Sequence, residues 1–182
     1  MRPLRLALAA SELAPFAKTG GLADVVLGLA RWLGNPKAKG TGAAGAGHDV
    51  RVFVPFYKSI QARGEPTTAL ERAQNIDVRF PQRTIRFSIR EGRLPDSDVA
   101  VYFVDCPELY HRASIYTDDG DEALRFAMLS RAVLETCQRL QWAPDVVHCN
   151  DWHTGLLPLY LRTVYQWDRL FAKTKTLLTI HN

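Results

Sequence analysis

Short apolar runs alternate with segments of helical spacing along most of this chain. The apolar run 4–10 is followed, after a polar stretch, by apolar residues that recur on one helical face: Leu22, Val25, Val26, Leu29 and Leu33. Further apolar runs predict strands at 48–57, 144–149 and 176–180. Strands that alternate with helices are typical of a parallel sheet with helices on both faces. The hydrophobic pattern therefore predicts an α/β fold with an open parallel sheet.

The middle of the chain follows a different pattern. The runs 76–80, 84–90 and 99–104 alternate with period two and carry arginines on one face, which predicts an antiparallel excursion that is half exposed to water. A polar loop with several aromatic residues follows at 106–120. Asp121 is placed to cap the next helix, whose apolar stripe consists of Leu124, Met128, Ala132, Leu134 and Leu140.

Composition limits the classes of protein to be considered. The length suits one domain, 1–182, in which the Gly/Ala-rich segment 34–47 predicts a flexible loop. A net charge of +4, with arginines spread along the chain, argues against nucleic acid binding. The N-terminal apolar run is too short for a signal peptide, and no run is long enough to span a membrane. The three cysteines lack a metal-binding spacing, which favours a reducing compartment and a cytoplasmic location, or a plastid if the source is a plant.

The segment 18–21 joins the first predicted strand to the first predicted helix and has the composition of an anion site. Gly20 and Gly21 permit positive φ and a close approach of the backbone to a ligand, while Lys18 adds a flexible positive charge. Because backbone N–H groups at the start of a helix favour phosphate, the segment suits a diphosphate. Asp24 is then either a first-turn carboxylate or a ligand contact. The alternative is a simple strand-to-helix turn with a solvated lysine.

Two further polar segments, 148–153 and 181–182, directly follow predicted strands. The carboxyl ends of parallel strands share one edge of a sheet, where ligands bind in such folds. We therefore expect these segments and the loop 18–21 to line one rim. The histidines and the aspartate of 148–153 also permit a metal site. This is the weaker alternative, because the segment accompanies a loop suited to a nucleotide.

Four motifs together resemble one protein family. The segment 11–25, Ser-Glu-Leu-Ala-Pro-Phe-Ala-Lys-Thr-Gly-Gly-Leu-Ala-Asp-Val, resembles the N-terminal signature of bacterial glycogen synthases and plant starch synthases. The segments 121–127, 148–153 and 179–182 resemble later motifs of the same family, in the same order. The resemblance therefore extends over most of the chain.

The sequence departs from the family pattern in three places. Glu122 stands where the family usually has asparagine, Asn150 stands in place of a histidine, and the segment 34–47 replaces a short turn. Family members are also more than twice as long. The chain thus corresponds to an N-terminal catalytic domain that is incomplete at its C-terminus.

The resemblance implies the first half of a GT-B glycosyltransferase, with a Rossmann-like parallel sheet, helices on both faces and an antiparallel β excursion. The implied reaction is the retaining transfer of glucose from ADP-glucose to the non-reducing end of an α-1,4-glucan such as glycogen or starch, without a metal or a cofactor. The chain alone is then expected to be inactive without the missing C-terminal GT-B domain. The alternatives are a non-catalytic glucan- or sugar-nucleotide-binding module and, less compatible with the paired glycines, a Rossmann oxidoreductase.

The resemblance also implies roles for the motif residues. Asp151 and His181 are expected to be catalytic. Contacts with ADP-glucose and the glucan are expected from Lys18, Gly20, Gly21, Asp24, Tyr116, His153 and Asn182. Lys18 and the glycine amides would meet the diphosphate and stabilise the leaving group. Tyr116 either lies near the sugar or is a packed loop tyrosine, and Trp152 supports packing or stacks on a sugar.

Overall fold

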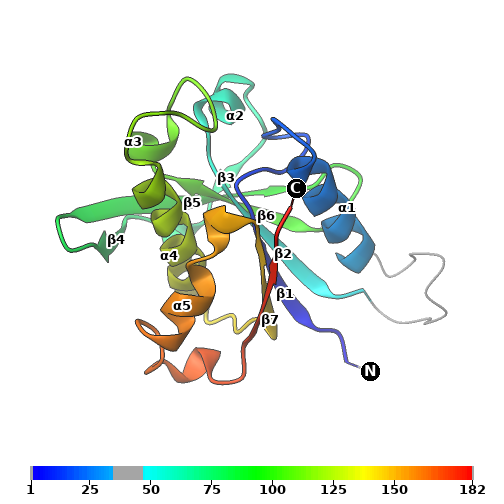
Figure 1. The fold of residues 1–182 in the computed structure, drawn as a ribbon. Coiled ribbons are helices and arrows are strands. Elements are labelled where there is room, and N and C mark those ends of the chain that lie inside the picture. Colours follow the sequence, from blue (N-terminus) through cyan, green and yellow to red (C-terminus); the bar gives the residue numbers. More distant parts are fainter. Residues whose placement is uncertain (1, 35–46, 182) are drawn as a thin grey trace.

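The computed structural model describes residues 2–34 and 47–181, so Asn182 and most of the predicted loop 34–47 lie outside the described residues. The centre of the sheet consists of parallel strands in the order β6 (Ala100–Asp105), β2 (Asp49–Pro55), β1 (Arg5–Ala9), β7 (Val146–Asn150) and β8 (Lys175–Thr179) (Figure 1). Antiparallel strands extend the sheet beyond β6: they are β5 (Thr84–Arg93), β3 (Thr68–Ala69) and β4 (Ile76–Arg79).

Helices cover both faces of this sheet. Helix α1 (Leu22–Gly34) lies on one face, and α4 (Glu122–Leu140) and α5 (Leu157–Arg162) lie on the other (Figure 1). The remaining helices are short: α2 (Lys58–Ala62), α3 (Pro107–Tyr110) and the 3₁₀ helices η1 (Glu71–Ala73), η2 (Trp152–Thr154) and η3 (Arg169–Phe171). None of the described helices combines the length and the apolar character needed to cross a membrane. The predicted Rossmann-like fold with an antiparallel excursion is confirmed.

The order of the parallel strands determines where a ligand can bind. The chain runs outward from β1 through β2 to β6 and then returns past β1 to form β7 and β8. The connections that follow β1 and β7 therefore leave toward opposite faces, which opens a crevice at the carboxyl ends of these two strands. The residues of β1 from Leu6 to Ala9 are all buried, because both faces of the strand are covered.

The run 99–104 was expected in an antiparallel excursion that is half exposed to water, and this expectation is only partly confirmed. The run forms β6, which pairs antiparallel with β5 as expected but parallel with β2 on its other side. Val101, Tyr102, Phe103 and Val104 are all buried, since this strand packs on both faces and needs an unbroken apolar run. True alternation is confined to the outer strands. In β4, for example, Ile76 and Val78 are buried whereas Asp77 and Arg79 are exposed.

The apolar positions of α1 and β8 are less buried than their patterns predict. Leu22, Val26 and Ala30 of α1 are buried, but Val25 lies at the margin of this stripe and is 43% exposed. In β8, the successive residues Leu177 and Leu178 are both about half exposed. Neighbouring strand residues point to opposite faces, so the sheet is open on both faces at this edge of the described chain.

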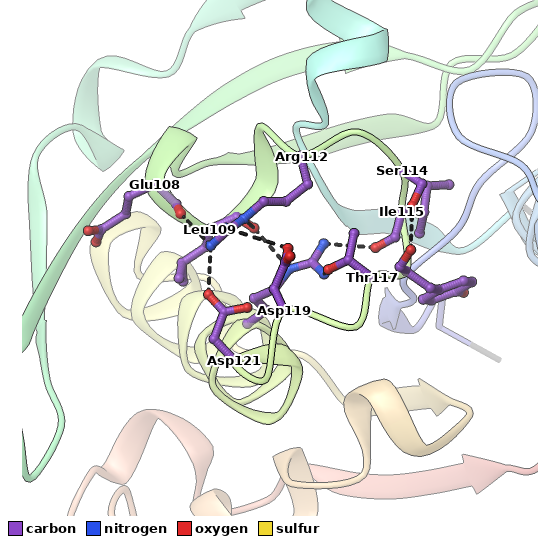
Figure 2. A network of polar contacts seen from close by, with 10 residues as sticks. Glu108, Leu109, Arg112, Ser114, Ile115, Thr117, Asp119 and Asp121 are labelled. Atoms are coloured by element: carbon purple, nitrogen blue, oxygen red, sulfur yellow. Dashed lines mark hydrogen bonds and ion pairs between the residues drawn. The ribbon is translucent and has the colours of Figure 1, made fainter.

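A buried arginine fixes the loop between α3 and α4. Arg125 of α4 is fully buried. Its Nε donates to the carbonyl oxygen of Leu109 (2.9 Å), its Nη2 to that of Ile115 (2.7 Å) and its Nη1 to Thr117 Oγ1 (3.1 Å) (Figure 2). The guanidinium group thus supplies the hydrogen-bond donors for backbone carbonyl groups that find no partner within a helix or sheet. The loop carries Tyr116 to the carboxyl edge of the sheet.

A second arginine changes the expected role of Asp121. This residue precedes α4, as predicted, but its side chain makes no capping hydrogen bond. It accepts a hydrogen bond from Arg112 Nη2 (2.6 Å) instead, and Arg112 also donates to the carbonyl oxygen of Glu108 (3.0 Å) (Figure 2). The prediction of a capping carboxylate is wrong because the nearby guanidinium group is the stronger partner.

We expect Arg125→Met to lower the free energy of unfolding by about 3 kcal/mol, because two buried carbonyl groups lose a charged donor. Urea unfolding followed by circular dichroism measures this change. Arg139→Met is the matched control, since Arg139 is exposed in the last turn of the same helix. Its expected effect is below about 0.5 kcal/mol. Equal effects of the two substitutions would contradict a stabilising role for the Arg125 hydrogen bonds.

Candidate functional site

The loops that follow β1, β7 and β8 meet at the crevice and line a cavity of about 370 Å³. The predicted site residues in its wall are Gly20, Gly21, Tyr116, Asp151, His153 and His181. The rest of the wall consists of Glu12, Leu22, Glu122 and Trp152. The structure thus brings the three polar strand-end motifs to one rim, and the loop before α4 adds Tyr116.

Lys18 and Asp24 are not in the wall of this cavity. Lys18 Nζ lies 2.7 and 2.9 Å from the two carboxylate oxygens of Asp24, and both side chains are about half exposed. Lys18 also lines a neighbouring cavity of about 570 Å³, together with Lys58, Arg63 and Arg112. The loop 18–21 therefore separates two hollows, one with lysine and arginine side chains and one without them.

The carboxylate of Glu12 shapes the loop 18–21 from within. It accepts hydrogen bonds from the backbone N–H groups of Thr19 (2.6 Å) and Gly20 (3.2 Å), and from the side chains of Thr19 (2.7 Å) and Tyr116 (2.7 Å). Burial alone would raise the pKa of the Glu12 carboxyl, but these donors outweigh it and hold the pKa below its ordinary value. The N–H group of Gly20 was expected to face a phosphate, but it donates to this internal carboxylate instead.

The two glycines of the loop have a different role from the one predicted. Neither has positive φ, which among the described glycines occurs at Gly64 and Gly120. A Cβ atom added to Gly20 or Gly21 would meet no atom within 4 Å. The expectation of a left-handed backbone is therefore wrong, and the absent side chains instead leave the wall of the cavity open.

Asp151 has a strained backbone at the end of β7. Its φ of 65° and ψ of 176° lie in a region that residues with a side chain rarely adopt. The conformation is held from both sides. The Asp151 amide donates to the carbonyl oxygen of Thr179 (2.8 Å), and the side chain accepts from the Trp152 amide (2.8 Å). The strain turns the chain sharply, so that Asp151, Trp152 and His153 all reach the cavity.

His153 is a neutral imidazole in an aromatic cluster. Its ring stacks on Tyr116 (4.9 Å between centroids) and meets Phe126 edge to face (4.5 Å). Burial lowers the pKa of His153 to about 4, although the carboxylates of Asp151 and Glu12 act in the opposite direction. Its Nδ1 atom is buried without a hydrogen-bond partner among the described residues. The cavity wall thus contains a neutral imidazole with one unsatisfied ring nitrogen.

Asn150 connects His181 to the end of the first strand. Its Nδ2 donates to the carbonyl oxygen of Ala9 (3.2 Å), and its Oδ1 lies 3.3 Å from His181 Nε2. His148, in contrast, bonds to Thr179 Oγ1 (2.8 Å) and is not in the wall of the cavity. Within residues 2–34 and 47–181, no three His, Cys, Asp or Glu side chains are arranged to hold a metal ion.

Two residues of the cavity wall, Glu12 and Glu122, are not among the predicted site residues. Glu12 could have been found, since it is the first acid after the apolar run 4–10 and belongs to the first motif. Glu122 was noted only as a departure from the family pattern. Its place in the cavity depends on how α4 packs against η2, which no local pattern specifies.

Known proteins resemble this chain in sequence. The family model described as the starch synthase catalytic domain matches residues 5–182. A glycogen synthase of Aeromonas salmonicida is 39% identical over 186 residues, and one of Desulforudis audaxviator is 43% identical over 183 residues. In both cases the match covers 100% of this chain and 35% of the relative.

A solved structure extends the likeness to three dimensions. It is the catalytic domain of starch synthase IV from Arabidopsis thaliana bound to ADP and acarbose, and it matches with a TM-score of 0.79 and 28% sequence identity. The match covers 100% of this chain and 34% of that structure. The chain therefore spans about a third of the length of these relatives. On the family model, the relatives and the fold together, this chain belongs to the starch synthase catalytic domain family.

Proposed function

We propose that this chain forms one wall of the active site of a glycosyltransferase that moves glucose from ADP-glucose to the non-reducing end of an α-1,4-glucan. The observation that carries the proposal is the cavity at the switch point, where Asp151, His153 and His181 converge beside the loop 18–21. Relatives of this chain are glycogen synthases, and the similar plant structure was bound to ADP and acarbose. Nucleotide and sugar are therefore the ligands to test first.

The distribution of charge suggests how such a ligand divides between the two hollows. The cavity wall contains the carboxylates of Glu12, Glu122 and Asp151 but no lysine or arginine. It suits the hydroxyl groups of a neutral sugar better than a phosphate. The diphosphate would instead lie at the other side of the glycines, where Lys18 exchanges Asp24 for a phosphate oxygen and stabilises the leaving group.

Roles for the reacting groups follow from this placement. Asp151 and His181 would contact the transferred glucose and the incoming hydroxyl group, and the neutral His153 would act as a hydrogen-bond partner rather than as a cation. Tyr116 would hold the His153 ring. The relatives are about three times as long as the chain, and we propose that their further residues supply the facing wall that excludes water during transfer.

Lys18→Ala is expected to weaken ADP binding roughly tenfold, because one charge-assisted hydrogen bond to phosphate is lost. NMR titration of the 182-residue chain with ADP up to millimolar concentration detects even a weak complex. Lys173→Ala is the control, since Lys173 is exposed and lines neither of the two hollows. Equal weakening by both substitutions would mean that Lys18 contributes only general charge. No ADP binding by the chain would contradict the proposed function.

Gly21→Ala is expected to abolish the binding of ADP-glucose without unfolding the chain. The new methyl group has room in the fold but occupies ligand space at the rim. The free energy of unfolding should stay within about 1 kcal/mol of the wild-type value. Gly28→Ala is the matched control, because a Cβ there also meets no atom within 4 Å but Gly28 lies in α1, away from the cavity wall. Thermal unfolding and the same titration separate the two effects. Unchanged binding by Gly21→Ala would exclude this rim as the ligand site.

A further inference from the structure

Glu122 occupies a defined place in the sugar-sized cavity. It is the first residue of α4, and its side chain is part of the cavity wall together with Trp152 and His153. Phe126 follows four residues later on the same face of the helix. Its ring lies 5.4 Å from that of Trp152 and 4.5 Å from that of His153. Glu122 therefore belongs to the face of α4 that packs against η2.

The carboxylate of Glu122 has an unsatisfied oxygen. Oε1 is buried and has no hydrogen-bond partner among the described residues. The other carboxylates of the cavity are engaged: Glu12 accepts hydrogen bonds from Thr19, Gly20 and Tyr116, and Asp151 accepts one from the Trp152 amide. A buried acceptor without a donor destabilises the fold, so its persistence calls for a donor that is not part of the described chain.

The same wall contains a second unsatisfied atom, Nδ1 of His153. His153 also lines the cavity and is only 6% exposed. A carboxylate can only accept, whereas a neutral imidazole nitrogen either accepts or donates. Hydroxyl groups donate and accept, and a sugar carries several of them. A hydroxyl-rich ligand is therefore the chemical class that satisfies both atoms.

We propose that Glu122 is a specificity-determining residue whose carboxylate accepts a hydrogen bond from a hydroxyl group of the sugar in this cavity, beside His153. This inference rests on the proposed function. It names the side chain that selects which sugar the cavity accepts. The family usually has asparagine at this position. Because asparagine can donate as well as accept a hydrogen bond, it would tolerate a sugar that presents an acceptor to it. Glu122 excludes such sugars, and it repels those that carry a carboxylate.

The test compares ADP-glucose, ADP and ADP-glucuronic acid on the wild-type chain and on Glu122→Gln. The substitution keeps the size of the side chain but removes its charge and one acceptor. The expected result is a roughly tenfold loss of affinity for ADP-glucose, no change for ADP and a gain for ADP-glucuronic acid. Glu108→Gln is the control, because Glu108 also lies in the first turn of a helix but is not in the cavity wall. It should leave all three affinities unchanged.

The outcomes separate this inference from the proposed function. Equal affinities of wild type and Glu122→Gln for ADP-glucose, with ADP binding still sensitive to Lys18→Ala, would overturn the role of Glu122 and leave the proposed function standing. If the wild-type chain binds neither nucleotide, the proposed function fails. Glucose at millimolar concentration then tests Glu122 alone, because it should shift the His153 ring signals of the wild type and not those of Glu122→Gln. Absence of that difference would overturn the inference.

Unfolding measurements distinguish lost binding from lost structure. Oε1 has no partner within the described chain, so Glu122→Gln removes no hydrogen bond at that atom and should unfold at a urea concentration close to that of the wild type. A markedly lower midpoint, together with equal losses of ADP and ADP-glucose binding, would show that Glu122 supports the fold and does not select the sugar.

Discussion

The buried carboxylate of Glu12 is the interaction on which the candidate site depends. A carboxylate that is 3% exposed must have donors, and this one finds them in two loops that are about a hundred residues apart in the chain. By accepting from Thr19, Gly20 and Tyr116 it fixes the loop after β1 against the loop before α4. Tyr116 in turn stacks on His153 and so extends the connection to the loop after β7. One charge therefore couples three segments that a sheet alone would leave independent.

The fold could be predicted from the sequence because its main determinants are local. Parallel strands with both faces covered require unbroken apolar runs, and such runs are visible without knowledge of their neighbours. The same property explains why β6 is buried and not half exposed, although it pairs antiparallel with β5 as expected. The run 99–104 stood next to two alternating runs and was grouped with them, although Val101, Tyr102, Phe103 and Val104 leave no polar face. The burial of all four residues distinguishes this strand, which is covered on both faces, from the outer strands, in which buried and exposed residues alternate.

The candidate site was predictable only in part, for a physical reason. Motif residues could be assigned to one rim because the carboxyl ends of parallel strands coincide. Which atoms are already satisfied within the protein could not be predicted, because that depends on contacts between distant segments. Gly20 looked like an amide donor for phosphate, but Glu12 takes its N–H group. Asp121 looked like a helix cap, but Arg112 takes its carboxylate. Arg125 gave no sign of its burial, since the carbonyl groups that it binds belong to another loop.

The backbone of Asp151 has a consequence for how this protein can change over time. A glycine would adopt its φ of 65° without strain, so the aspartate costs the fold on the order of 1–3 kcal/mol. Replacement by glycine would relieve this strain, but it would also remove the hydrogen bond to the Trp152 amide and the carboxylate at the rim. The acid at this position therefore combines a strained backbone with a polar group at the rim, and a change here alters both the stability of the turn and the chemistry of the cavity.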